Sequence, residues 1–162
     1  MIAASLHHPG IVVPNLEQAI EFYSNALGYE VHSESSFGPD DDGFNQVVGL
    51  SRAAAKFCML RGRNSYIEIF EYQDAIPKDK QESTASEEGI RHLAFVVENV
   101  EHAIELCERC GGSKINDPVS VPGGATAAYC RDPFGNLLEF VVPGGRFPAL
   151  LPMTTNKVNN NE

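Results

Sequence analysis

Two short segments each place one glutamate among four apolar or aromatic residues. Residues 66–70 read Tyr-Ile-Glu-Ile-Phe, and residues 137–141 read Leu-Leu-Glu-Phe-Val. Such continuous apolar runs are typical of strands that are covered on both faces. A buried, ionised carboxylate without a partner is very costly. We therefore expect Glu68 and Glu139 to be protonated, paired or bound to a metal ion.

Two histidines occupy matching places in the two halves of the chain, because His8 and His92 both precede a strand-like run. Neutral imidazole and carboxylate are the usual ligands of divalent Zn, Ni, Co, Mn or Fe. Two carboxylates would balance the charge of one such ion. Four protein ligands would leave one or two positions for water or substrate. We predict one divalent metal ion held by His8, Glu68, His92 and Glu139.

The sequence contains an internal repeat. Residues 8–22 read HPGIVVPNLEQAIEF, and residues 92–106 read HLAFVVENVEHAIEL. Because polar positions match as well as apolar ones, the similarity indicates a tandem duplication. The alignment selects His8 over its neighbour His7 as the first ligand, and in a strand His7 would point to the opposite face.

Each copy predicts the same order of elements. A strand (11–13 and 95–97) leads into a helix whose N-terminus is capped by Asn15 or Asn99 and which ends at a glycine, Gly28 or Gly112. Three strands follow in each copy, near residues 30–35, 55–60 and 66–72, and near residues 114–121, 125–131 and 137–142. The sequence thus predicts an α+β fold of tandem βαβββ modules.

The boundaries of the modules follow from composition. We expect the first module at 1–73, a linker rich in charged residues and Ser/Thr at 74–89, and the second module at 90–147. Residues 148–162 form a tail that ends in NKVNNNE and has little to bury, so we expect it to be partly disordered.

Charge excludes several classes of partner. The 162 residues carry a formal net charge of −10, which repels nucleic acid and anionic membrane surfaces. With no bilayer-spanning run and no export signal, we expect a soluble, cytoplasmic protein. The basic segment 52–63 is best interpreted as a solvated strand edge, with an anionic substrate as the alternative.

The four cysteines do not indicate a disulfide framework in a chain without an export signal. Cys107 and Cys110 form a C-x-x-C pair, but no further ligands are spaced to complete a zinc site. We expect Cys58, Cys107, Cys110 and Cys130 to be buried or half-buried free thiols.

Residues 33–44 form an acidic, glycine-punctuated stretch that we expect to be a loop. Its phenylalanines could close over a substrate as a lid does. Residues 40–42 are all aspartate but lack the alternate spacing of a calcium loop. The predicted substrate pocket consists of Phe37, Phe44, Tyr66 and Phe70.

These motifs resemble the vicinal oxygen chelate superfamily, which includes glyoxalase I, methylmalonyl-CoA epimerase, extradiol dioxygenases and fosfomycin-resistance proteins. The resemblance covers about residues 5–143 and rests on HPGIVV from His8, RHLAF around His92 and DPFGNLLE ending at Glu139. It implies paired βαβββ modules that curl into a cup around a metal ion, with ligands at His8, Glu68, His92 and Glu139. Some relatives complete that site across a dimer, and we expect a homodimer here.

The resemblance implies proton transfer or isomerisation, of the lyase or isomerase type, on a small α-oxygenated carbonyl substrate. Glu139 or Glu68 would then act as the base. The polar residues by which glyoxalases contact glutathione are absent after Glu68, and Asn45-Gln46 stands where epimerases carry an acidic base.

Two other functions stay open. An extradiol dioxygenase would hold Fe(II) with His8, His92 and Glu139 beside Tyr129, but residues 73–91 contain no histidine to act as its base. A non-catalytic protein that binds a small molecule such as an antibiotic would usually lose the ligands, all of which are present here.

Overall fold

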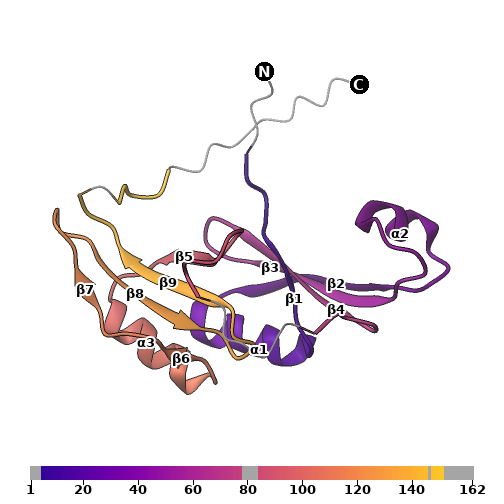
Figure 1. Cartoon of the computed structure of the whole chain (residues 1–162), viewed down its shortest axis with the longest axis horizontal. Coiled ribbons are helices and arrows are strands. Elements are labelled where there is room, and N and C mark those ends of the chain that lie inside the picture. Colours follow the sequence, from indigo (N-terminus) through magenta and orange to yellow (C-terminus); the bar gives the residue numbers. More distant parts are fainter. Residues whose placement is uncertain (1–4, 78–83, 146, 152–162) are drawn as a thin grey trace.

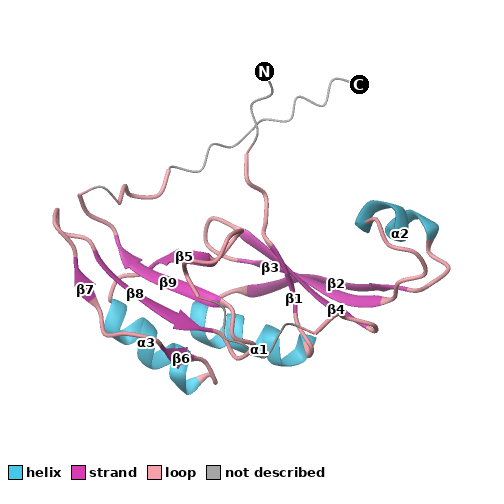
Figure 2. Ribbon diagram, in the orientation of Figure 1, coloured by secondary structure: helices cyan, strands magenta, loops and turns pink. Residues whose placement is uncertain are grey.

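The computed structural model describes residues 5–77, 84–145 and 147–151. The first module forms a four-stranded sheet in the order β1-β4-β3-β2 (Figures 1 and 2). Its elements are β1 Gly10–Val12, α1 Leu16–Leu27, β2 Glu30–Phe37, α2 Asp42–Val48, β3 Ala55–Arg61 and β4 Tyr66–Tyr72.

The second module repeats this topology in the order β5-β9-β8-β6, with β7 also paired to β8. Its elements are β5 His92–Val96, α3 Val100–Arg109, β6 Ser113–Lys114, β7 Val119–Ser120, β8 Thr126–Arg131 and β9 Leu137–Val142. In both modules the first strand runs parallel to the last, and the other pairings are antiparallel. The predicted tandem βαβββ fold is confirmed.

One predicted strand is wrong in detail. In place of one strand at 114–121, the chain forms two short strands, β6 at Ser113–Lys114 and β7 at Val119–Ser120. Pro118 lies between them and cannot donate a backbone hydrogen bond to the neighbouring strand. Lys114 and Asp117 bridge the gap, with Nζ 2.6 Å from Oδ1.

The helices begin where the sequence predicts. The side chain of Asn15 accepts a hydrogen bond from the backbone N–H of Gln18, and that of Asn99 accepts one from His102. A less local contact completes the start of α1, because the Leu16 N–H donates to the Glu71 carboxylate at 2.7 Å. The carboxylate also lies at the positive end of the helix dipole.

Helix α3, the helix of the second module, ends earlier than predicted. It stops at Arg109, and the left-handed residue that follows is Gly111, with φ of 93°. Gly112 is required for a different reason. A Cβ at Gly112 would lie 2.5 Å from the Arg131 carbonyl oxygen and 2.5 Å from Cys107 Sγ, so only glycine allows the chain to pass.

The stretch predicted as a loop at 33–44 is mostly regular structure. Residues 33–37 pair with β3, and α2 follows. Asp41 caps α2 by accepting from the Phe44 N–H, and Gly49 ends it in the left-handed conformation. The buried Asn45 side chain then accepts a hydrogen bond from the backbone N–H of Ala53. The aspartates at 40–42 therefore serve local structure, and Asp40 pairs with Arg52.

A single core joins the two modules. Helices α1 and α3 pack against each other on one side of the sheets (Figure 1). Apolar residues of both modules contribute to one buried cluster. The Tyr23 hydroxyl donates across the module boundary to the Asp132 carboxylate at 3.1 Å, and both residues are buried. Burial raises the pKa of the Tyr23 phenol well above its ordinary value, and Asp132 raises it further.

Three of the cysteines, Cys58, Cys107 and Cys130, are buried, Cys110 is half-buried, and all four are free thiols. Burial raises the pKa of Cys58 to about 11, so this thiol is not a nucleophile at neutral pH. Parts of the expected linker and tail, residues 78–83 and 152–162, lie outside the described residues. Across the described chain, no helix has the length and apolar character needed to cross a bilayer.

Asp132 accepts hydrogen bonds from the backbone N–H groups of Phe134 and Asn136 as well as from Tyr23. Its contribution to the free energy of unfolding should therefore exceed that of the Tyr23 hydrogen bond alone. Tyr23→Phe should lower the free energy of unfolding by about 1 kcal/mol, whereas Asp132→Ala leaves buried donors unpaired and should cost about 2–4 kcal/mol. Urea denaturation measures both, with Asp132→Asn as an intermediate control. Equal losses for Tyr23→Phe and Asp132→Ala would contradict this account.

Candidate metal centre

The first candidate pair forms where β1 begins beside β4. Gly10 lies opposite Glu68 in the register, and His8 precedes Gly10 by two residues. The His8 Nε2 atom lies 3.1 Å from Glu68 Oε2. Only 20% of the Glu68 side chain is exposed, so its carboxylate is largely withdrawn from water and His8 is its partner.

The second pair repeats this geometry. Ala94 lies opposite Glu139, and His92 precedes Ala94 by two residues. His92 Nε2 lies 3.1 Å from Glu139 Oε2, and the Glu139 side chain is 12% exposed. The duplication predicted from sequence has therefore produced one His–Glu pair in the same place of each module.

Both pairs have the spacing of neighbouring metal ligands. Two donor atoms about 2.1 Å from one ion and at a right angle to each other lie about 3 Å apart. Each His–Glu pair, at 3.1 Å, fits one edge of such a coordination sphere. The donor types also fit, since imidazole and carboxylate suit divalent transition metals.

Neither pair is a complete site within one chain. Among the residues that the structure describes, no three His, Cys, Asp or Glu side chains come together to hold an ion. Each module thus contributes one His–Glu pair, called a half-site below, and one chain does not bring the four predicted ligands around a single point.

His7 does not face away from His8 as predicted. Residues 5–9 precede β1 and have no strand conformation, so side chains need not alternate there. His7 Nδ1 lies 2.6 Å from His8 Nδ1. The His7 ring also stacks on Tyr66, and His32 packs edge-on against the same tyrosine. The sequence does not indicate the contact of His32 with Tyr66, because His32 lies at an irregularity in β2.

Tyr129 lies beside the second pair. It is directly opposite Glu139 in the register, and its ring is 5.2 Å from that of His92. Burial raises the pKa of the Tyr129 phenol, and the charge of Glu139 raises it further. The first module has Met59 at the matching position opposite Glu68. The two His–Glu pairs are therefore alike in residue types and different in surroundings.

Aromatic residues extend from the first pair along the sheet. Phe70 stacks on Phe57 and Tyr72, and Phe44 stacks on Phe37. Phe44 also contacts Phe57, which joins the rings into one cluster. Three predicted pocket residues thus lie together, whereas Tyr66 lies apart, against His7. Sequence reasoning missed Phe57 and Tyr72, although both lie on the Glu68 face of their strands.

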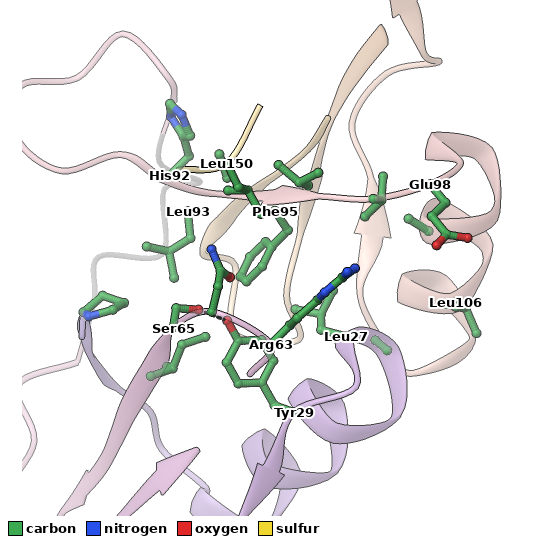
Figure 3. A pocket seen from close by; sticks show the side chains of 18 of the residues that line it. Leu27, Tyr29, Arg63, Ser65, His92, Leu93, Phe95, Glu98, Leu106 and Leu150 are labelled. Atoms are coloured by element: carbon green, nitrogen blue, oxygen red, sulfur yellow. Dashed lines mark hydrogen bonds between the residues drawn. The ribbon is translucent and has the colours of Figure 1, made fainter. Parts of the chain in front are cut away.

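A cavity of about 950 Å³ lies between the modules (Figure 3). It is lined by β5, the start of α3, the end of α1 and the turn at residues 63–67. His92 and Tyr66 border it, but Glu68 and Glu139 do not. Arg63 extends into it, while Tyr29 and Ser65 are hydrogen-bonded at 2.6 Å. Elsewhere in the basic segment, Arg61 pairs with Glu30. The predicted strand edge is wrong, because β3 lies between β4 and β2 in the sheet.

Comparisons with known proteins agree with this fold. A family model described as the glyoxalase/bleomycin resistance protein/dioxygenase superfamily matches residues 5–140. A 2-epi-5-epi-valiolone epimerase from Actinomyces sp. is 30% identical over 151 residues, which are 88% of this chain and 82% of that protein.

Solved structures share the fold. A glyoxalase family protein from Bacillus cereus superposes with a TM-score of 0.79 at 18% identity, covering 90% of this chain and 97% of that one. A fosfomycin resistance protein from Listeria monocytogenes, solved with Mn(II) and sulfate, has a TM-score of 0.60 at 18% identity and covers 90% and 98%.

The tyrosines beside the two carboxylates allow each half-site to be tested separately. Burial and then Glu68 raise the pKa of Tyr72, as burial and Glu139 raise that of Tyr129. Removing a nearby negative charge makes phenolate less costly, so Glu139→Gln should lower the pKa of Tyr129 and leave that of Tyr72. Glu68→Gln should do the reverse. Phenolate absorbance measures both pKa shifts, with Tyr→Phe variants to assign them. An unchanged pKa of Tyr129 in Glu139→Gln would refute the interaction of Tyr129 with Glu139.

Proposed function

Because the chain belongs to the glyoxalase/bleomycin resistance protein/dioxygenase superfamily, we propose that it is a divalent-metal-dependent enzyme that moves a proton next to a carbonyl group. The observation that supports this most is the repetition of one His–Glu pair, at 3.1 Å, in both modules. The epimerase name of the relative with 30% identity supports an isomerase over a lyase.

The complete site would form between two copies of the chain. His8 and Glu68 of one copy would join His92 and Glu139 of the other. Two observations support this arrangement. No strand of the described residues pairs with the free edges of β1 and β5. Large apolar side chains are exposed near these edges, including Leu6, Ile90 and Val96 at 90%, 88% and 41%. Such surfaces and open edges are usually covered by a partner.

The residues would divide the chemistry between them. A divalent ion at this site would stabilise negative charge that develops on the carbonyl oxygen of the substrate. Glu68 and Glu139 are related by the duplication and would approach the substrate from opposite sides. One carboxylate would remove the proton from the carbon next to the carbonyl, and the other would return a proton to the opposite face. That sequence inverts the carbon, as an epimerase requires.

The same geometry favours this reaction over the alternatives. An Fe(II) dioxygenase would use three of the four groups and leave Glu68 outside the site, yet Glu68 is paired as closely as Glu139. A binding protein without chemistry has no need for two partly buried His–Glu pairs.

Mixing two inactive variants tests whether the site is shared. His8→Ala with Glu68→Ala removes one half-site, and His92→Ala with Glu139→Ala removes the other. Neither double variant alone should bind the ion tightly. Because half of randomly mixed dimers are hybrids and each hybrid holds one intact site of two, the mixture should regain about a quarter of the wild-type sites. Titration with Zn²⁺ and a chromogenic chelator measures this after refolding together. No recovery would exclude a shared site.

Solvent-deuterium exchange tests the reaction. The metal-loaded protein should incorporate deuterium next to the carbonyl of a hydroxylated ketone, beginning with 2-epi-5-epi-valiolone, the compound in the relative's name. Glu139→Gln and Glu68→Gln should each slow the exchange by about 10²- to 10⁴-fold. Glu21→Gln, on the exposed side of α1, is the matched control and should not. Oxygen uptake with a catechol would instead support the dioxygenase.

A further inference from the structure

Both ring nitrogens of His8 have partners. Its Nε2 lies 3.1 Å from the Glu68 carboxylate, and its Nδ1 lies 2.6 Å from Nδ1 of His7. The three side chains therefore form a continuous chain of contacts from Glu68 through His8 to His7. A histidine that binds a metal usually donates its other ring N–H to a fixed acceptor, which sets the tautomer and orients the ring.

The short contact between the two rings can hold only one proton. A neutral imidazole carries one N–H and one bare nitrogen. If His7 donates, the single proton of His8 stays on Nε2 and points at Glu68. If His8 donates from Nδ1, its Nε2 is bare and faces Glu68 with a free lone pair. Only the second arrangement leaves Nε2 able to bind a cation.

The His7 ring is held in place beside His8. Its ring stacks on Tyr66 with the planes 9° apart and the centroids separated by 5.3 Å. Tyr66 belongs to β4 and lies on the same face as Glu68, two residues away. The strand that carries the carboxylate therefore also orients the His7 ring.

The second module has no histidine in the position that corresponds to His7. The residue before His92 is Arg91, and its guanidinium pairs with Glu87 at 2.6 Å. In the described part of the chain, the structure shows no hydrogen bond to Nδ1 of His92. The duplication thus kept the ligands and changed the residue beside the first of them.

We propose that His7 is a positioning residue for His8. It accepts a hydrogen bond from His8 Nδ1 and so holds His8 in the tautomer whose Nε2 binds the divalent cation together with Glu68. This inference rests on the proposed function. The exchange between the two tautomers is charge-neutral: the His8 proton moves from Nε2 to Nδ1, while the His7 proton moves from Nδ1 to Nε2 through solvent.

Three single variants separate the hydrogen bond from the ring contact. His7→Phe keeps an aromatic ring to stack on Tyr66 and removes the acceptor. His7→Asn removes the ring and keeps a polar acceptor near the former Nδ1. His32→Phe is the matched control, because His32 contacts Tyr66 but not His8. Circular dichroism confirms that each variant is folded.

Zn²⁺ affinity, measured by competition with a chromogenic chelator, is the first readout. His7→Phe should weaken binding by about 10- to 100-fold, which is the usual effect of losing such a partner. His7→Asn should recover most of the affinity, and His32→Phe should match the wild type. Nitrogen-15 NMR of the zinc-loaded wild type should show the proton of His8 on Nδ1, with slow solvent exchange that His7→Phe makes fast.

Equal affinities of His7→Phe and the wild type would overturn the role of His7 and leave the metal site intact. So would a loss of affinity in His7→Asn as large as in His7→Phe, because an acceptor near the former Nδ1 would then not restore binding. A wild-type protein that binds no Zn²⁺, Mn²⁺, Co²⁺, Ni²⁺ or Fe²⁺ would overturn the proposed function itself.

Discussion

Each module has a carboxylate in the middle of an apolar strand, and a partner must offset the cost of withdrawing that charge from water. The rest of the structure depends on this constraint. Glu68 and Glu139 lie in the middle of β4 and β9, where the flanking side chains pack into the common core. A shift of either strand by one residue would turn its carboxylate toward the helices and its core residues outward. The parallel neighbour must therefore begin at a fixed register, so that a histidine arrives two residues before the position opposite each glutamate.

The duplication gives each module two of the four proposed metal ligands. Two donors 3.1 Å apart are suited to one cation but are too few to hold it. In the described chain, helices α1 and α3 cover one face of the sheets, and the carboxylates lie on the other. An assembly that brings two half-sites together would complete the ligand set and cover the exposed apolar residues in one step. This is why we place the proposed centre between two copies rather than within one.

Local patterns in the sequence predicted most of the elements and the composition of both pairs. The repeat aligns His8 with His92, and the apolar strands identify Glu68 and Glu139, because a lone carboxylate within an apolar run can be recognised from the sequence. Helix α2 was missed although Asp41 and Gly49 mark its ends, since the acidic run was interpreted as a loop. The separation of the half-sites and the contact of His7 with His8 depend on how distant segments pack, which spacing along the chain does not encode.

The central claim is that each module gives one imidazole and one carboxylate to a single shared ion. Crystals grown with Zn²⁺ and measured at its absorption edge would locate the ion directly. The account predicts one anomalous peak per chain, bound by His8 and Glu68 of one copy and by His92 and Glu139 of another. Separate peaks at the two His–Glu pairs, or a peak away from both, would contradict it.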